Sequence, residues 1–242
     1  DFVLVRSNGL LTYVVPDIAY HYNKLVTRGF DRAIDVLGAD HHGYVPRLKA
    51  ALQALGVDPT RLQVVLMQMV RLIRDGEVVK ASKRSGKAIT LVTLLEEIPI
   101  DAARFYFNLR EANSQLDFDL DLAVEQSSSN PVYYVQYAHA RICSIFRNLE
   151  AEGVSPRDCT PNELERLSTP EERELIRFLA AYPDEIVTAA RELDPSRITR
   201  YALDLAGLFH KFYNACRVKG EAEPLMQARL SLCAAARTVL KN

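Results

Sequence analysis

The first part of the chain alternates short apolar runs with amphipathic stretches. Two apolar runs, residues 33–38 and residues 62–70, have the length and composition of buried strands. Residues 44–55 between them carry leucines at helical spacing, and Gly56 follows as a helix stop. The leucines expected on the buried helical face are Leu48, Leu52 and Leu55. This strand–helix–strand order predicts part of a parallel α/β sheet.

A hairpin is expected directly after the second strand. Residues 72–79 form two short apolar arms around Asp75-Gly76, a pair suited to the positive φ angles of a tight turn. The chain then enters a basic loop, residues 79–87, which holds four cationic side chains, two serines and a glycine. Such a loop suits a polyphosphate whose charge grows during a reaction. A plain solvated loop is the alternative interpretation.

From Asn130 onward the pattern becomes purely helical. Asn130 and the proline after it stand at favoured N-cap and first helical positions, and Thr169 begins a capping box. Pro183 splits the next segment into two helices, residues 225–240 form the last helix, and residues 152–169 form the longest loop. Apolar stripes cover Val135, Ala138, Ile142, Ile145 and Leu149 on one helix and Ile198, Tyr201, Leu205, Leu208, Phe212 and Cys216 on another. Four or five such amphipathic helices predict a bundle.

Composition and charge narrow the class of protein. A length of 242 residues suits one large or two modest domains, and the net charge of -1 means that any nucleic-acid contact comes from local patches. No apolar run approaches the ~20 residues that span a bilayer. The cysteines lack the paired spacing of a zinc site, which favours reduced thiols in the cytoplasm. They are Cys143, Cys159, Cys216 and Cys233. We therefore expect a cytoplasmic protein with no membrane partner and no protein-bound metal.

A polar segment, residues 38–43, follows the first predicted strand. Ligands of parallel sheets bind outside the carboxyl ends of the strands. Asp40 can accept hydrogen bonds from a ribose there, and Gly38 lets the backbone come close to a ligand. The adjacent His41 and His42 lack the ligand spacing of a metal site. A capped polar turn is the alternative interpretation.

Two further groups of side chains suggest binding chemistry. Tyr13 and Asp17 share a helical face, where a carboxylate can bind a guanidinium and a tyrosine ring can support it. The alternative is that Asp17 caps a helix after Pro16. On the helix after Asn130, Tyr133, Tyr137 and Arg141 share one face and Tyr134 lies beside it. Such side chains stack on unpaired bases, although Tyr134 and Tyr137 could instead be core aromatics of the bundle.

Several of these stretches resemble one family. Residues 80–84, Lys-Ala-Ser-Lys-Arg, resemble the Lys-Met-Ser-Lys-Ser loop of class I aminoacyl-tRNA synthetases, with Ala81 for Met and Arg84 for the last Ser. Residues 130–141 resemble the opening of the anticodon-binding domain of arginyl-tRNA synthetases, and residues 12–21 resemble the arginine-pocket segment of the same enzymes. Residues 227–230, Gln-Ala-Arg-Leu, resemble the sequence for which the bundle domain is named. The similarity to bacterial-type members runs over nearly the whole chain.

The resemblance implies a fold of two parts, α/β and then all-α. Residues 1–119 correspond to the second half of the class I nucleotide-binding (Rossmann-like) domain, and residues 120–242 correspond to a helical-bundle anticodon-binding domain without its extreme end. The His-Ile-Gly-His type signature of class I synthetases does not occur in the 242 residues. We therefore expect a fragment of an arginine–tRNA ligase that is inactive alone. The parent is expected to be a monomer that uses arginine, tRNA(Arg) and ATP, with Mg2+ carried by ATP.

The resemblance also assigns roles to residues. Lys80, Ser82 and Lys83 match the catalytic loop, in which the two lysines contact ATP and stabilise pyrophosphate. Gly38 and Asp40 match the segment that contacts the ATP ribose. The residues that match the arginine pocket are Tyr13, Asp17 and His41, and those that match anticodon contacts are Tyr134, Tyr137, Arg141, Tyr213 and Arg217.

Two rival interpretations remain at this point. A different class I synthetase fits less well, because residues 130–141 differ from the bundles of the cysteinyl and isoleucyl enzymes. A non-enzymatic tRNA-binding or protein-interaction module is the second rival, since Ala81 departs from the family loop. An intact His-Ile-Gly-His type signature in the parent gene would decide between an enzyme and such a module.

Overall fold

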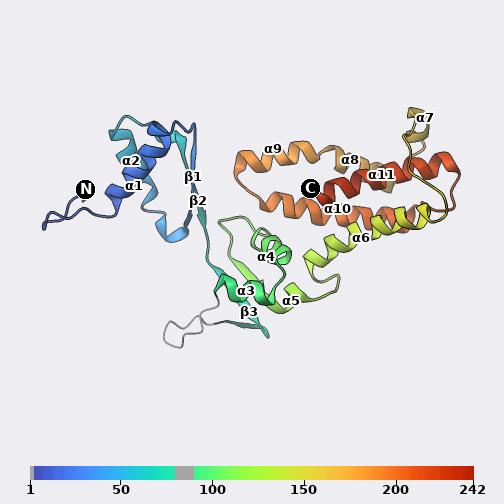
Figure 1. Cartoon of the computed structure of the whole chain (residues 1–242), viewed down its shortest axis with the longest axis horizontal. Helices are drawn as coiled ribbons and strands as arrows, with labels where there is room; N and C mark the ends of the chain where they lie inside the picture. Colours follow the sequence, from blue (N-terminus) through green and yellow to red (C-terminus); the bar gives the residue numbers. More distant parts are fainter. Residues whose placement is uncertain (1–2, 80–89) are drawn as a thin grey trace. The chain divides into compact units, whose positions relative to one another are not determined.

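The computed structural model describes residues 3–79 and 90–242. The chain divides into two compact units (Figure 1). Unit 1 comprises Asp1–Arg71 with Ala112–Leu116, and unit 2 comprises Leu72–Glu111 with Asp117–Asn242. In the described part of the chain, no helix is long and apolar enough to cross a membrane.

Unit 1 contains the predicted strand–helix–strand order. Helix α1 (Val14–Tyr22) continues into a π-helical turn and leads to β1 (Ala33–Gly38); α2 (Val45–Ala54) then leads to β2 (Leu62–Met67). The two strands pair in parallel, with Ala33 opposite Leu62 and Gly38 opposite Met67. The core of this unit consists of Leu25, Ala33, Leu48, Leu52, Val57 and Leu62. The pairing brings the carboxyl ends of both strands to one edge.

Two details of unit 1 differ from the sequence prediction. The strand expected at residues 62–70 ends at Met67, because the backbone N–H of Gln68 donates instead to the carbonyl of Ala112 (2.8 Å). Leu55, expected on the buried face of the helix, is 53% exposed. It is the C-cap of α2, and Gly56 follows it with a φ of 77°. The helix stop at Gly56 is therefore confirmed, while the buried face is limited to the two leucines within the helix.

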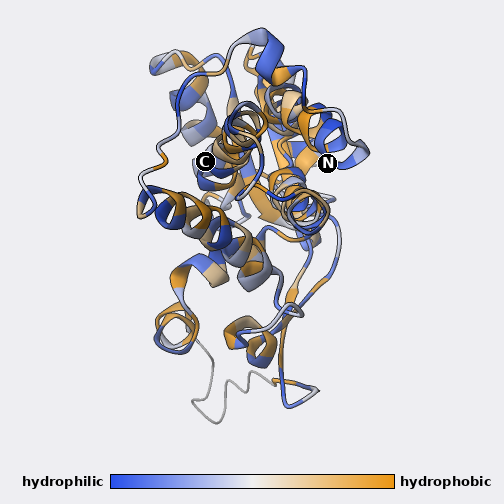
Figure 2. Cartoon of the chain, turned by 90° about the vertical axis from the view of Figure 1, so that its right-hand side faces the viewer, coloured by the Kyte–Doolittle hydropathy of each residue, from blue (hydrophilic) through white to orange (hydrophobic). Residues whose placement is uncertain are grey.

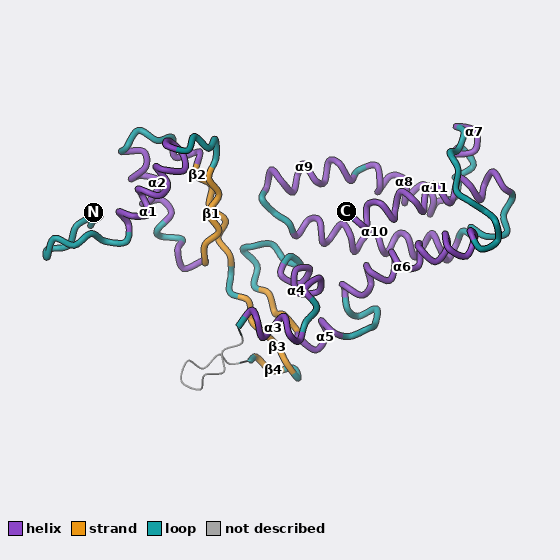
Figure 3. The backbone as a smooth tube through the Cα atoms, in the orientation of Figure 1, coloured by secondary structure: helices purple, strands orange, loops and turns teal. Residues whose placement is uncertain are grey.

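The predicted hairpin is confirmed. Strand β3 (Val70–Arg74) pairs antiparallel with β4 (Glu77–Val78), and the turn residues Asp75 and Gly76 have φ angles of 52° and 76°. The strand order in this sheet is β4-β3-β5, with β5 at Leu116–Asp119 (Figure 3). Helices α3 (Leu91–Glu97) and α4 (Ile100–Phe107) lie between β4 and β5 in the sequence, and α5 (Leu120–Val124) follows.

The helical region of unit 2 follows the capping signals in the sequence. The helices are α6 (Pro131–Glu150), α7 (Pro161–Leu164), α8 (Pro170–Ala180), α9 (Tyr182–Glu192), α10 (Ser196–Ala215) and α11 (Glu223–Lys241). Asn130 caps α6, and Thr169 forms a capping box with Glu172 at the start of α8. Pro183 lies in the first turn of α9, where the predicted split occurs. The predicted loop of residues 152–169 holds only the short α7.

The bundle core follows the predicted apolar stripes. Figure 2 shows hydrophobic and hydrophilic residues alternating along the helices, as expected of amphipathic packing. From the stripe on α6, Val135, Ala138, Ile142 and Leu149 are buried. The buried stripe residues of the later helix and its end are Tyr201, Leu205, Phe212 and Cys216. The other stripe residues, Ile145, Ile198 and Leu208, are half-buried.

A buried ion pair ties α8 to α11. The Nε atom of Arg229 lies 2.7 Å from Oε1 of Glu172, and the two side chains are 8% and 0% exposed. Burial opposes ionisation of Glu172, but hydrogen bonds from the Thr169 backbone and from Arg229 lower its pKa. Removing one partner of such a pair leaves an uncompensated buried charge, so the pair fixes how the two helices meet.

The compact units do not divide at 119/120. Residues 72–111 belong to the same compact unit as the bundle, because Phe105 of this segment packs against the bundle core. The hydroxyl of Tyr106 also donates to Oδ1 of Asn130 (3.4 Å), and the hydroxyl of Thr199 donates to the carbonyl of Asn108. The division into a catalytic part, 1–119, and an anticodon-binding part, 120–242, stays a prediction about domains.

Asn130 gives a test of how the bundle begins. Its Oδ1 accepts from the N–H of Val132 (3.0 Å), and its Nδ2 donates to the carbonyls of Glu125 (2.8 Å) and Ala123 (3.2 Å). Asn130→Ala removes the cap and the donors to the carbonyls of Ala123 and Glu125, the first of them buried, so we expect a loss of about 2–4 kcal/mol in the free energy of unfolding. Urea unfolding followed by helical circular dichroism measures it.

The matched control is Asn148→Ala, an exposed position on the same helix. It should change the free energy of unfolding by less than about 0.5 kcal/mol. Equal effects of the two substitutions would contradict the role given to Asn130.

Candidate functional site

Helices α6 and α10 together form a cluster of aromatic and basic side chains. We call it the aromatic–arginine cluster. Its members are Tyr133, Tyr134, Tyr137 and Arg141 of α6 and His210 and Tyr213 of α10. The α6 members recur at helical spacing, and the two α10 members are three residues apart, so each set lies along one side of its helix.

Arg141 is the centre of the cluster. Its guanidinium carbon lies 4.6 Å from the ring centroid of Tyr137 and 4.8 Å from that of Tyr213. Its Nη2 atom also donates to the hydroxyl of Tyr137 (2.7 Å). The cation is therefore held near one ring from each helix, at the distance of a cation–π contact.

The tyrosines of the cluster differ in exposure. Tyr137 is 43% exposed and Tyr213 is 39% exposed. Tyr133 stacks on Tyr137, with ring centroids 6.0 Å apart and ring planes 13° apart. Tyr134 is half-buried against the bundle core, with its ring edge-on to His210. The core alternative therefore applies in part to Tyr134, whereas Tyr137 and Tyr213 have ring surface on which a base could stack.

The cluster contains one residue that the sequence did not predict, His210, and lacks one that it did predict, Arg217. His210, which the sequence analysis did not select, has its Nδ1 atom 3.3 Å from Nη1 of Arg141. Its position three residues before Tyr213 was the available signal. Arg217 lies beyond the end of α10 with an exposed side chain, and its carbonyl accepts from Arg229. Among the described residues, no contact joins the Arg217 side chain to the cluster.

The predicted arginine-pocket residues meet around Tyr44. The Tyr44 hydroxyl donates to Oδ2 of Asp17 (2.7 Å). The ring of Tyr44 lies 5.8 Å from that of Tyr13 and 6.2 Å from that of His41, centroid to centroid. Burial, and then the hydrogen bond to Asp17, raise the pKa of Tyr44 above its usual 10. Tyr13, not Asp17, occupies the N-cap of α1, so the interpretation of Asp17 as a helix cap is wrong.

His21 fixes the helix that carries Asp17. The His21 side chain is buried, with Nδ1 2.7 Å from the carbonyl oxygen of Asp17 and Nε2 2.5 Å from Oδ2 of Asp35. Lys24 contacts the other oxygen of Asp35 (3.1 Å). Because Asp35 lies on β1, these contacts hold α1 against the strand that ends at Gly38.

Gly38 and Asp40 lie at the carboxyl end of β1. A Cβ atom on Gly38 would lie 2.6 Å from Oδ1 of Asp40, so the glycine leaves room for that carboxylate. The Asp40 side chain is 85% exposed, and its Oδ2 lies 4.0 Å from Nε2 of His41. The predicted catalytic residues Lys80, Ser82 and Lys83 lie outside the described residues.

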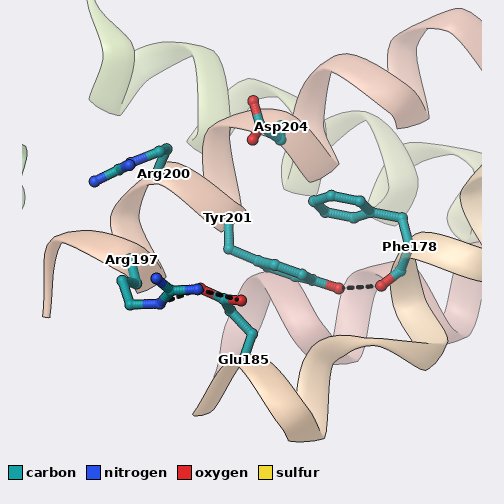
Figure 4. A pocket seen from close by; sticks show the side chains of 6 residues that line it. All are labelled: Phe178, Glu185, Arg197, Arg200, Tyr201 and Asp204. Carbon is teal, nitrogen blue, oxygen red and sulfur yellow. Dashed lines mark hydrogen bonds and ion pairs between the residues drawn. The ribbon is translucent and has the colours of Figure 1, made fainter. Parts of the chain in front are cut away.

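The described residues also bear on a metal site and on a cavity in the helical region. No group of three or more His, Cys, Asp and Glu that could hold a metal occurs in residues 3–79 and 90–242. A cavity of about 180 Å³ lies between α8, α9 and α10 (Figure 4). Two contacts join residues of its lining: Arg197 pairs with Glu185 (2.7 Å), and the Tyr201 hydroxyl donates to the carbonyl of Phe178 (2.6 Å). These contacts indicate that the residues around the cavity hold α8, α9 and α10 together.

Tyr44→Phe tests the contact around which the pocket residues meet. The substitution keeps the ring but removes the donor to Asp17, so unit 1 should lose about 1.5–2 kcal/mol, the low end for a bond to a charged group. Hydrogen exchange of amides in α1 and α2 measures this loss.

Tyr20→Phe is the control, because Tyr20 is 57% exposed and no hydrogen bond of its hydroxyl occurs among the described residues. Unchanged exchange in Tyr44→Phe would contradict the role of this contact.

The chain is similar to several known proteins. Residues 135–242 match the DALR anticodon binding domain. All 242 residues align with arginine–tRNA ligases, at 57% identity for Ruminiclostridium cellulolyticum and 59% for Caldanaerobacter subterraneus subsp. tengcongensis. In both cases the chain spans 43% of the length of the relative.

Solved structures show the same fold. A crystal structure described as an arginyl-tRNA synthetase from Campylobacter jejuni matches with a TM-score of 0.83 and 34% identity, over 99% of this chain and 52% of that one. The Thermus thermophilus arginyl-tRNA synthetase matches with a TM-score of 0.83 over 99% of this chain and 48% of that one, at 24% identity. The α/β part followed by a helical part is thus the architecture of these enzymes. By similarity over its entire length, the chain belongs to the arginyl-tRNA synthetase family and corresponds to a carboxyl-terminal part of its members.

Proposed function

We propose that the chain is the tRNA-binding part, together with the second half of the catalytic domain, of an arginine–tRNA ligase. The observation that carries the proposal is the aromatic–arginine cluster. Tyr137, Arg141, His210 and Tyr213 of this cluster lie within residues 135–242, which match an anticodon-binding domain, and Tyr133 and Tyr134 come directly before them. Exposed rings beside an arginine suit unpaired bases and their phosphates. The parent enzyme would act in the cytoplasm as a monomer, with arginine, ATP and tRNA(Arg) as substrates.

The proposed reaction has two steps. The carboxylate of arginine attacks the α-phosphate of ATP and releases pyrophosphate, which gives arginyl-adenylate. The terminal ribose hydroxyl of tRNA(Arg) then takes the arginyl group and releases AMP. Mg2+ would enter with ATP, and we assign it no protein ligands.

We assign the guanidinium of the substrate to Asp17. Tyr44 donates to one oxygen of this carboxylate and leaves lone pairs that a planar guanidinium can use. The exposed ring of Tyr13 lies beside the ring of Tyr44 and can support the cation. The ring of His41 also contacts the ring of Tyr44. A guanidinium fits such a site better than an ammonium, which would select arginine over lysine.

The nucleotide is assigned to the end of β1 and to the basic loop. Asp40 is exposed where a ribose could donate to it, and Gly38 keeps the space beside it open. By resemblance, Lys80 and Lys83 stabilise the charge that develops on pyrophosphate, while Ser82 helps to order the loop. The alternative, a non-enzymatic binding module, is not favoured because the relatives across the whole chain are ligases.

The binding proposal is tested with the 242-residue chain and tRNA. We expect tRNA(Arg) to bind more tightly than the same tRNA with a swapped anticodon. Tyr137→Ala should weaken the binding of tRNA(Arg) about tenfold or more, because one base–aromatic stack contributes roughly 1–3 kcal/mol. Fluorescence anisotropy of labelled tRNA measures both effects.

Gln136→Ala is the control, since Gln136 is exposed on the same helix and points in a different direction from Tyr137. Its affinity should equal that of the unchanged chain. Equal affinity for both tRNAs, unaffected by Tyr137→Ala, would refute the proposal.

The catalytic assignment is tested in a full-length ligase that carries this sequence. Lys83→Ala should lower the rate of adenylate formation about 10²–10³-fold, the usual cost of losing one contact to transition-state charge. The KM for arginine should change little, because the lost contact forms on the phosphate side. Arginine-dependent ATP–pyrophosphate exchange measures both constants. An unchanged kcat would make the basic loop an ordinary solvated segment.

A further inference from the structure

His210 lies where the two helices of the aromatic–arginine cluster meet. Its ring is half-buried, edge-on to Tyr134 at 5.0 Å and tilted to Tyr137 at 6.0 Å between ring centroids. Its Nδ1 atom lies 3.3 Å from Nη1 of Arg141. One histidine of α10 therefore contacts three side chains of α6 that the sequence analysis assigned to RNA.

The contact with Arg141 fixes the proton of His210. A guanidinium has only N–H donors, so Nδ1 of His210 has to be the unprotonated acceptor. The ring proton then sits on Nε2, and the imidazole is neutral. A protonated ring would lose this hydrogen bond and would place a second positive charge beside Arg141.

This hydrogen bond completes the set of contacts on Arg141. The guanidinium donates to the Tyr137 hydroxyl through Nη2 and to His210 through Nη1, and it lies near the rings of Tyr137 and Tyr213. A free arginine side chain loses rotamer entropy when a ligand orders it. Holding the side chain in advance removes part of that cost from binding.

We infer that His210 is a positioning residue for RNA: its neutral ring accepts from Arg141 and holds that guanidinium between Tyr137 and Tyr213 in the orientation that binds an anticodon nucleotide. This inference rests on the proposed function, because it assumes that the cluster binds RNA. It goes beyond that function by giving the cluster a protonation state in which it works.

The geometry predicts how binding depends on pH. Burial, and then the charge of Arg141, lower the pKa of His210 below its usual 6.5. The charged or titratable groups that face the His210 ring are Tyr134, Tyr137 and Arg141 from α6. Neither tyrosine nor arginine ordinarily titrates between pH 5 and 8, whereas histidine does. Binding should be strong at pH 7–8 and fall as the pH decreases through the lowered pKa.

Two substitutions separate the hydrogen bond from the packing of the ring. His210→Asn places an amide oxygen near the position of Nδ1, so it can accept from Arg141 but cannot titrate. His210→Phe keeps an aromatic ring and lacks the acceptor. Thermal unfolding of both variants serves to check that the bundle is intact.

The experiment measures the affinity of the 242-residue chain for tRNA(Arg) between pH 5.5 and 8. We expect the unchanged chain to lose affinity severalfold at the acid end, and His210→Asn to bind within about threefold of it at pH 7.5 with a flat pH profile. His210→Phe should bind about tenfold more weakly at pH 7.5, the loss of roughly one hydrogen bond. Nitrogen NMR of the free chain should show the Nε2–H tautomer of His210 at pH 7.5.

The outcomes distinguish this inference from the proposed function. Full affinity of His210→Phe, or equal pH profiles for the unchanged chain and His210→Asn, would overturn the role of His210 while RNA binding itself stands. An Nδ1–H tautomer in the free chain would also overturn it. Failure of the unchanged chain to bind tRNA(Arg) at any pH would overturn the proposed function and this inference together.

Discussion

The buried packing of α6 against α10 determines where the groups proposed to bind RNA lie. Ala138 and Ile142 of α6 and Phe209 and Phe212 of α10 are each 0% exposed. Four of the six members of the aromatic–arginine cluster are direct sequence neighbours of these residues. Tyr137 and Arg141 precede the buried pair on α6, and His210 and Tyr213 follow the buried pair on α10. Since neighbours on a helix are about 100° apart, burying the apolar four brings the polar four to the rim of the same contact.

In unit 1, too, a contact between two elements determines where the groups proposed to bind the substrate lie. The buried His21 of α1 contacts the half-buried Asp35 of β1, and this contact leaves Asp17 and Tyr13 at the start of α1. Tyr44, just before α2, then reaches Asp17. The proposed substrate groups are thus set by contacts that need no ligand, which is how a binding site is kept ready before its substrate arrives.

The sequence predicted local features well where one residue type has one structural use. Asp75-Gly76 suits the positive φ angles of a tight turn, and Asn130 and Thr169 accept hydrogen bonds from the free N–H groups at helix starts. Pro183 cannot continue a preceding helix and lies in the first turn of the next one. It predicted less where tertiary contacts decide. The end of β2 depends on Ala112, far along the chain, and the burial of Leu55 depends on where α2 stops. The sequence did not predict His210 and Tyr44 as site residues, because their proposed roles depend on contacts with residues that are distant in the sequence. Neither periodicity nor local composition indicates such contacts.

We propose that anticodon-loop nucleotides lie on the rim formed by α6 and α10. Photocrosslinking tests this placement most directly, with 4-thiouridine built into the anticodon loop of tRNA(Arg) and the crosslinked peptides identified by mass spectrometry. We expect crosslinks to the peptides that contain Tyr137 and Tyr213, and their loss when the anticodon is swapped. Crosslinks confined to other parts of the chain, such as α9 or unit 1, would contradict it.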